Sequence, residues 1–310
     1  MNICTTTAIL SEACDDDKMI SGPEAVRRLS EHGYKSLDYD FSFYRSEDYI
    51  LRGDDWEKKV DEVANMAAKC GVTFAQSHIT FCHISHTFDE YLRNTEHLEY
   101  YNESTRRAYI ASGMLGVKYA TIHPLTDINT LAKEDCVRLN HEYYDKYIEL
   151  GMKYNVGTAY ENMFTPFDRC VVATYCQHPQ DLIELVDSYN DSRVGICWDF
   201  GHANEAKINQ PYALRAMGKR LKNVHINDNS GGRDEHLLPF MGNIDWFTVI
   251  PVLAEIGYEG DLAFETGMIT RHAARGLQDA YINAAYACGE FILNIYNEAV
   301  EKKMNLFKAD

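Results

Sequence analysis

The chain has 310 residues, of which 45% are hydrophobic and 25% charged, and its formal net charge is −17. This composition is that of an ordinary globular protein, and the length fits either one large domain or two smaller ones. The strong negative charge argues against a broad nucleic-acid-binding surface, which needs clustered Lys and Arg. No apolar run reaches the roughly 18 residues that a membrane-spanning helix requires.

Nine cysteines are scattered along the chain without a CxxC motif. The N-terminal stretch "MNICTTTAILSEACDDD" has no basic start and turns acidic early, unlike a secretory signal. Reduced thiols in a cytoplasmic protein are therefore the simplest interpretation, and each cysteine is expected to be a small buried hydrophobic residue.

Short β-like runs alternate with helical patterns along the whole chain. The helical segments carry apolar residues at intervals of three and four, and the first two end in Gly, a common helix stop. Strands are expected at residues 2–10, 35–44, 72–80, 117–124, 156–164, 193–200, 221–228 and 261–266. Helices are expected at residues 22–33, 54–71, 89–116 (a long segment expected to be broken), 133–155, 178–190, 210–221, 244–258 and 273–299.

Eight repeats of strand and helix predict an α/β fold with one closed (β/α)₈ barrel, the TIM barrel. The chain has no low-complexity stretch and no obvious linker, so we expect a single domain over residues 1–310. An open, doubly wound sheet is the alternative. That fold normally has a Gly-rich phosphate loop after its first strand, whereas "TTTAILSEACDDD" contains no Gly.

In a TIM barrel the active site lies at the C-terminal ends of the strands. The ends of the third to eighth expected strands, with the loop after the seventh, are rich in Asp, Glu and His. These residues are His78, His123, Glu161, Asp199, His202, His225, Asp228, Asp234, His236 and Glu265.

Each of these residues, taken alone, has an ordinary structural explanation. A single His near a strand end is more often a hydrogen-bonded core residue, and Asp199 with His202 could form a helix cap. Glu161 and Glu265 are harder to explain, because an unpaired buried carboxylate costs on the order of several kcal/mol. One divalent cation satisfies several such groups at once. Carboxylate and imidazole ligands suit Mn²⁺, our first expectation, and also Mg²⁺, Co²⁺ or Zn²⁺.

The stretches "WDFGHAN", "NVHINDNSGGRDEHLLPFMGNIDW" and "GYEGDLAFE" together resemble the sugar-phosphate isomerase/epimerase superfamily of xylose-isomerase-like TIM barrels, which includes D-tagatose 3-epimerase-like enzymes. The resemblance implies one divalent metal ion held by Glu161, Asp199, His225 and Glu265. The superfamily also includes endonuclease IV, which holds three zinc ions. Residues matching its additional ligands in type are His78, His123, His202, Asp234 and His236.

The resemblance further implies a sugar isomerase or epimerase that removes a proton alpha to a carbonyl and forms an enediolate. We expect Glu161 and Glu265 to transfer this proton, with His202 and His236 as further catalytic residues. The expected substrate-binding residues are His78, His123, Arg233, Asp234 and Trp246, with Trp246 in a stacking wall for the sugar.

The sequence leaves two alternative activities open. The same chemistry gives β-elimination if a group leaves from the neighbouring carbon, as in dehydratases and C-glycoside deglycosidases. A trinuclear zinc nuclease is the second alternative, and the net charge disfavours it. We expect a small sugar or sugar derivative as the ligand, no nucleic acid and no membrane. A homo-oligomer or a complex with a small partner subunit is possible.

Three local features add detail to this interpretation. Phe240 and Met241 replace the glycine region that usually precedes "IDW" in the family, in a loop that normally lies near the substrate. Asp38 stands where many relatives have Glu after the second strand. The loop "FCHISHTF", residues 81–88, is interpreted as a substrate lid rather than as a metal site.

Overall fold

The computed structural model describes residues 1–10, 20–42, 48–80, 95–126, 132–165, 174–271 and 273–307. These residues form a sheet of eight parallel strands. Strands β1 to β7 are neighbours in chain order, and β8 pairs with β1. Each strand lies inside one of the expected runs and is shorter than that run. The strands are β1 (Ile3–Thr6), β2 (Ser36–Asp40), β3 (Thr73–His78), β4 (Tyr119–Ile122), β5 (Gly157–Glu161), β6 (Val194–Asp199), β7 (Leu221–His225) and β8 (Leu262–Phe264).

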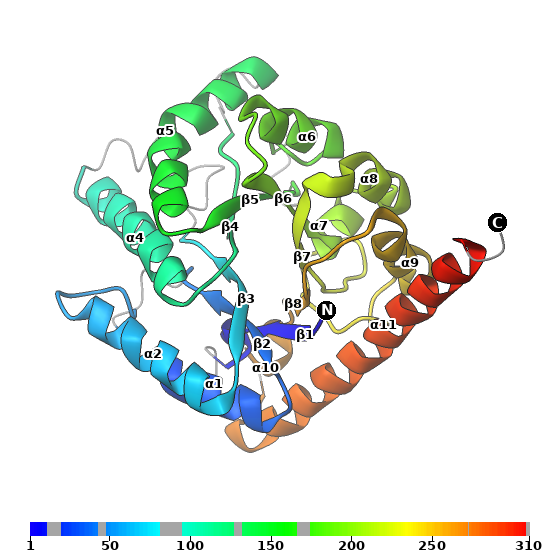
Figure 1. Ribbon diagram of the computed structural model, residues 1–310, viewed down its shortest axis with the longest axis horizontal. Coiled ribbons are helices and arrows are strands. Elements are labelled where there is room, and N and C mark those ends of the chain that lie inside the picture. The colour runs from blue at the N-terminus through cyan, green and yellow to red at the C-terminus, as the bar shows by residue number, and fades with distance from the viewer. Residues whose placement is uncertain are drawn as a thin grey trace.

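The sheet closes into a barrel between β7 and β8. Ile226, directly after β7, forms a parallel bridge with Phe264 of β8. The N–H of Ile226 donates to the carbonyl of Ala263 at 2.7 Å, and the N–H of Glu265 donates to the carbonyl of Ile226 at 3.1 Å. Figure 1 shows the ring of strands with the helices around its outside. The expected TIM barrel is confirmed, and the open doubly wound sheet is excluded.

The helices largely match the expected segments. The described part of the segment expected to be broken, Thr95–Met114, is one continuous helix. Two short helices, α7 and α10, were not expected. The described helices are α1 (Gly22–Glu31), α2 (Trp56–Cys70), α4 (Thr95–Met114), α5 (Lys133–Lys153), α6 (Pro179–Ser188), α7 (Phe200–Glu205), α8 (Gln210–Met217), α9 (Trp246–Ile256), α10 (Met268–Arg271) and α11 (Gln278–Phe307).

Local signals in the sequence set the ends of these helices. Gly71 and Gly257 follow α2 and α9 with φ of 64° and 72°, the left-handed conformation that Gly adopts without strain. The outer helices cover the barrel, and all six residues of β6 are buried. None of the helices in the described ranges is both long and apolar enough to cross a membrane.

Candidate metal centre

Four side chains meet at the C-terminal mouth of the barrel, and we call them the quartet: Glu161, Asp199, His225 and Glu265. One ligand atom of each lies within 4.8 Å of the corresponding atoms of the others. Nδ1 of His225 lies 2.9 Å from Glu161 Oε1, 3.2 Å from Glu265 Oε2 and 3.9 Å from Asp199 Oδ2. The first three members of the quartet are at most 1% exposed. The quartet is therefore a compact, buried set of oxygen and nitrogen ligands.

The register of the parallel strands brings the quartet together. Glu161, the last residue of β5, pairs with Cys197 of β6. Asp199, the last residue of β6, pairs with His225, the last residue of β7. Glu265 follows β8 directly and is tied to the end of β7 by the hydrogen bond that closes the barrel. Because all the strands are parallel, their C-terminal ends lie on one rim, and the side chains converge there.

Asp199 is a helix cap as well as a member of the quartet. Its Oδ1 accepts the backbone N–H of His202 at 2.6 Å and so caps α7. Its Oδ2 accepts a hydrogen bond from the side-chain amide of Asn227 at 2.7 Å. The side chain of Asn162 bonds both backbone groups of Asp199. The capping interpretation of the Asp199–His202 spacing is correct, and the same carboxylate still faces the rest of the quartet.

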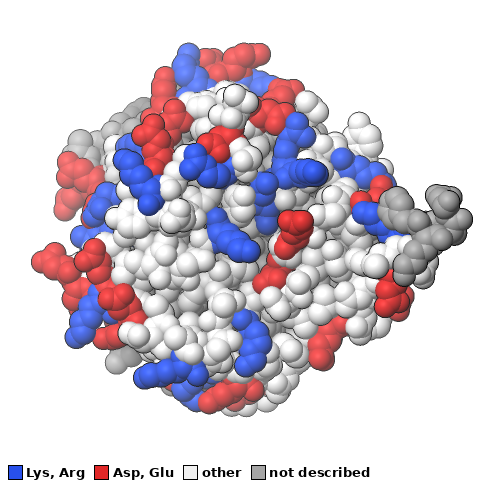
Figure 2. Space-filling model, viewed as in Figure 1, with Lys and Arg blue, Asp and Glu red and all other residues white. Residues whose placement is uncertain are grey.

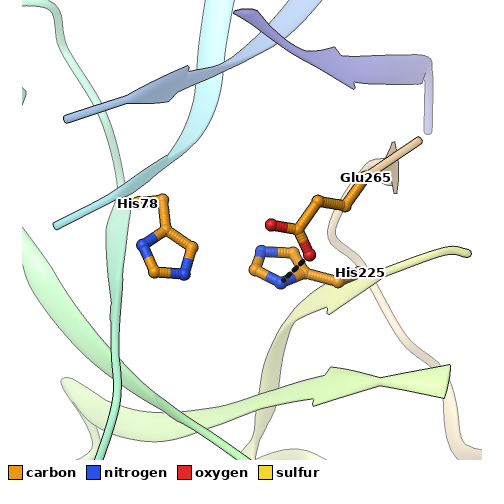
Figure 3. A group of neighbouring side chains, drawn as sticks. All are labelled: His78, His225 and Glu265. Carbon is orange, nitrogen blue, oxygen red and sulfur yellow. Dashed lines mark ion pairs between the residues drawn. The ribbon is translucent and has the colours of Figure 1, made fainter. Parts of the chain in front are cut away.

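Glu161 also belongs to a second group, with His78 and His123. Its Oε2 lies 3.2 Å from Nε2 of His78 and 3.1 Å from Nε2 of His123, while its Oε1 faces His225. The rings of His78 and His225 stack with their centroids 5.6 Å apart. Figure 3 shows these two imidazoles and the carboxylate of Glu265 directed toward a common space. One carboxylate, that of Glu161, therefore joins two groups of ligands.

A third group lies beside the quartet and consists of His202, Asp234 and His236. Asp234 Oδ2 lies 2.9 Å from Nε2 of His236 and 3.8 Å from Nε2 of His202. Asp234 Oδ1 is buried, and no hydrogen-bond partner for it exists among the described residues. His236 has a φ of 45°, which is uncommon for a residue other than Gly, and its Nδ1 lies 2.8 Å from the carbonyl of Glu265.

Burial raises the pKa of every carboxylate in the quartet, and the imidazoles oppose this effect to different extents. For Glu161, the charge of His225 and hydrogen bonds from three histidines outweigh burial and hold the pKa well below its usual range. For Glu265, the charge of His225 and a hydrogen bond from it bring the pKa down to about 2. For Asp199, burial prevails and the pKa rises to about 6. The quartet thus favours additional positive charge at its centre.

The donor set fits a divalent cation. The ion pairs of Glu161, Asp199 and Glu265 are all with histidines, and no Lys or Arg in the described ranges pairs with these three carboxylates. Burial raises the pKa of the nearby Cys197 thiol to about 12, so it supplies no thiolate. Oxygen and imidazole ligands without sulfur suit Mn²⁺, Mg²⁺, Co²⁺ or Zn²⁺.

Trp246 does not occupy the position expected of a substrate-stacking wall. Its side chain is fully buried, packs against Phe200 with ring centroids 5.3 Å apart, and donates its indole N–H to Asp228 at 2.9 Å. Asp228 also accepts the backbone N–H groups of Phe240 and Ile244. These two residues therefore anchor the loop after β7 and the start of α9, and a sugar has no access to the indole.

The remaining expected substrate-binding residues differ in position. His78 and His123 lie in the second group and Asp234 lies in the third, all beside the quartet. Arg233 is exposed in the loop after β7. The segment interpreted as a lid, residues 81–88, lies outside the described residues.

The sequence did not indicate that two buried side chains, those of Asp38 and Gln76, lie beside the quartet. Oδ2 of Asp38, in β2, lies 3.7 Å from Nε2 of His225 and accepts a hydrogen bond from the side chain of Gln76 at 3.1 Å. Oδ1 of Asp38 is buried without a hydrogen-bond partner among the described residues. The only signal in the sequence was an acidic residue inside an expected strand, residues 35–44.

Comparisons with known proteins agree with this architecture. The chain superimposes on a D-tagatose 3-epimerase-like protein with a TM-score of 0.72 and 20% identity, over 98% of this chain and 100% of that one. A structure of the IOLI protein with a bound zinc atom gives a TM-score of 0.73 and 17% identity, over 96% and 99% of the two chains. At these identities the likeness concerns the fold.

Sequence comparison finds relatives over shorter regions. Inosose isomerase of Bacillus subtilis is 26% identical over 157 residues, 49% of this chain and 54% of that protein. The matched regions span only about a quarter to about half of the relatives' own lengths, from 27% to 54%. A family model described as the xylose isomerase-like TIM barrel matches residues 26–281. The chain therefore belongs to the xylose isomerase-like TIM barrel family.

Proposed function

We propose that the protein is a divalent-metal-dependent isomerase or epimerase of a ketose or a related keto-sugar. One observation carries the proposal: two glutamates from separated strands, Glu161 and Glu265, face the same centre together with Asp199 and His225. The named activities of relatives, inosose isomerase and D-psicose 3-epimerase, support a small polyhydroxylated carbonyl compound as the substrate.

The quartet would hold the cation. When bound, the cation would supply charge stabilisation for the oxygen that becomes negative as the substrate loses a proton. The pKa values of Glu161 and Glu265 lie below the usual range, because imidazole contacts outweigh burial, so both side chains are ionised at neutral pH. An ionised carboxylate next to the substrate can accept the proton alpha to the carbonyl.

Proton return decides which product forms. One glutamate takes the proton, and the other, once it has been protonated by solvent, gives a proton back, either to the opposite face of the same carbon or to the neighbouring carbon. The first outcome is epimerisation and the second is aldose–ketose isomerisation. The side chain of Glu265 is 22% exposed, whereas that of Glu161 is 1% exposed, so Glu265 is the more accessible from the barrel mouth. His202 and His236 would hydrogen-bond the substrate oxygens.

Deuterium exchange tests the proposed chemistry directly. The protein, loaded with Mn²⁺, is incubated in D₂O with a panel of ketoses, inososes and 3-oxo-glycosides, and exchange at carbon is followed by NMR. Exchange with a new epimer or isomer supports the proposal, whereas loss of a group from the β-carbon identifies a lyase. Absence of exchange with every compound, in protein that retains its metal, contradicts the proposal.

A matched pair of substitutions tests the two glutamates. Glu161→Gln and Glu265→Gln should each lower kcat by about 10²–10⁴-fold, the usual contribution of a general acid or base. Glu149→Gln, at an exposed position of α5, should leave kcat unchanged. Near-normal turnover in either active-site variant would rule out its assigned role in proton transfer.

A three-metal hydrolytic site is a second candidate, because a specific observation favours it. The quartet, the group of His78, His123 and Glu161, and the group of His202, Asp234 and His236 provide three sets of ligands side by side. Metal analysis of the purified protein separates the candidates. One ion per chain supports the sugar enzyme, whereas three zinc ions together with cleavage of DNA at abasic sites would support the nuclease.

A further inference from the structure

Several large apolar side chains are exposed beside α11 and the loop after β7. The described residues include ten large hydrophobic side chains that are exposed, and six of them lie in the loop after β7, at the start of α9, and in or just before the first half of α11. A contiguous exposed apolar patch on a soluble protein typically marks an interaction site. We call this surface the α11 face, and its exposed large residues are Phe240, Met241, Phe247, Leu277, Tyr281 and Phe291.

Three phenylalanines form the densest part of the α11 face. The ring centroid of Phe240 lies 5.6 Å from that of Phe247 and 5.5 Å from that of Phe291. The ring centroids of Phe247 and Phe291 are 6.2 Å apart. Each of the three is between 43% and 61% exposed. Phe240 has a φ of 71°, a left-handed conformation that favours Gly. The loop therefore accepts backbone strain and still presents a large aromatic ring to solvent.

The apolar residues of α11 follow the spacing of a helix that packs against another helix. Tyr281, Ala284, Cys288, Phe291 and Ile295 stand at intervals of three and four, and Leu277 extends the series by one turn. This spacing is that of a helix-pairing seam. Four of the six side chains are exposed, whereas Cys288 and Ile295 are half-buried against the core and Cys288 Sγ lies 3.6 Å from the carbonyl of Pro239. The described part of the chain therefore covers this flank of α11 only in part.

The seam is symmetric about its midpoint. Its intervals read 4-3-4-3-4 in both directions, with large residues at the ends, aromatic residues next and small residues at the centre. A two-fold interface brings the same surface of both subunits together, so it requires self-complementary patterns of this kind. From end to end, the seam consists of Leu277, Tyr281, Ala284, Cys288, Phe291 and Ile295.

The distribution of charge also favours a second copy of the chain. The first 20 residues of α11, 278–297, include only two charged side chains, Asp279 and Glu290, although 25% of the whole chain is charged. Asp279 pairs with Arg28 of α1, away from the seam. In Figure 2, the lower right edge, which α11 forms in Figure 1, carries fewer charges than the upper left edge. Two molecules of net charge −17 could approach each other here with little local repulsion.

We propose that the α11 face is the interface of a two-fold homodimer in which the α11 helices of two copies pack antiparallel. The midpoint of the seam lies at residue 286, so Tyr281 faces Phe291 of the partner subunit and Ala284 faces Cys288 of the partner subunit. Phe240 and Phe247 flank the seam. The proposal does not depend on the proposed function, because none of these residues belongs to the three ligand groups.

The oligomeric state and a designed cross-link test the interface. Sedimentation velocity of the wild-type protein over a range of concentrations should show a dimer, and the Tyr281→Glu/Phe291→Glu variant should weaken dimerisation by about 30-fold or more. Tyr212→Glu, which changes an aromatic residue of α8 that is 71% exposed, is the matched control and should remain dimeric.

The cross-link tests the register even if the double variant fails to fold. Ala284→Cys should form an intermolecular disulfide with the native Cys288 under mild oxidation, because facing positions of a tight helix pair come within disulfide reach. Ala284→Cys/Cys288→Ser and Ala280→Cys should not cross-link. A monomer at every concentration, a dimer without the cross-link, or a stable complex with a different small subunit at this face would each overturn the proposal.

Discussion

Nε2 of His225 lies 3.7 Å from Oδ2 of Asp38, while Nδ1 of the same ring lies 2.9 Å from Glu161. At 3.7 Å the Nε2 and Oδ2 atoms are not hydrogen-bonded, and Nε2 has no hydrogen-bond partner among the described residues. The nearby negative charge still favours a proton on Nε2 and leaves the lone pair of Nδ1 directed at the quartet. Outer carboxylates commonly orient metal-binding histidines in this way.

Asp38→Asn should therefore weaken cation binding by about 10–100-fold while the protein remains folded. Calorimetric titration of the metal-free protein with Mn²⁺ measures this affinity without any assay of turnover. Asp61→Asn, at an exposed position of α2, is the control and should bind as the wild type does. An unchanged affinity in the Asp38 variant would show that the ring is oriented by other contacts.

Cation binding should release protons and become tighter as the pH rises. Burial alone lowers the pKa of His225, but its neighbours Cys197, Glu265 and Glu161 outweigh burial and raise the pKa well above 6.5. The metal-free ring is therefore protonated at neutral pH, and a cation at Nδ1 must displace that proton. Titrations in buffers of different ionisation enthalpy count the released protons, and a pH-independent affinity would contradict this expectation.

Removal of the metal should lower the melting temperature. The bound cation stabilises only the folded state, by about 2.7 kcal/mol when its concentration is 100 times Kd. Thermal unfolding with EDTA and with added Mn²⁺ measures the shift. In Glu161→Gln, which removes a charged member of the quartet, the shift should be much smaller. Equal shifts in this variant and in the wild type would place the stabilising ion elsewhere.

Gly242→Ala should destabilise the loop that carries Asp234 and His236 of the third ligand group. A Cβ at this position would overlap the carboxylate of Asp228 and the backbone of Asn229, which cannot move without breaking the anchor of Trp246. The expected loss is about 1–3 kcal/mol of unfolding free energy in urea. Gly232→Ala, ten residues earlier in an open position, should change the free energy of unfolding by less than about 0.5 kcal/mol. Equal stability of both variants would argue against a tightly packed loop.

The fold was predictable from the sequence because strand and helix periods alternate clearly along the chain. The convergence of Glu161, Asp199, His225 and Glu265 was predictable for a related reason. In a parallel barrel, a polar residue at the end of a buried strand can only lie on one rim, so the position along the strand already determines the location.

Contacts that depend on side-chain direction were not predictable in the same way. Trp246 follows the loop after β7 and was expected at the substrate, but its indole turns inward to Asp228. Asp38 lies below the rim, and strand alternation alone does not reveal that its carboxylate reaches His225 from another strand. The helix α7 has only six residues, too few for a periodic pattern to show.

The closure of the barrel has a consequence for how the centre is held. β7 and β8 are joined by the bridge between Ile226 and Phe264, just where His225 and Glu265 project from the two sides of the joint. A cation bound to both side chains would act as a clasp across this joint and tie the last strand to the rest of the ring. The same ion would then serve the reaction and stabilise the contact between β7 and β8, so its loss would both remove the reactive centre and weaken this part of the barrel wall.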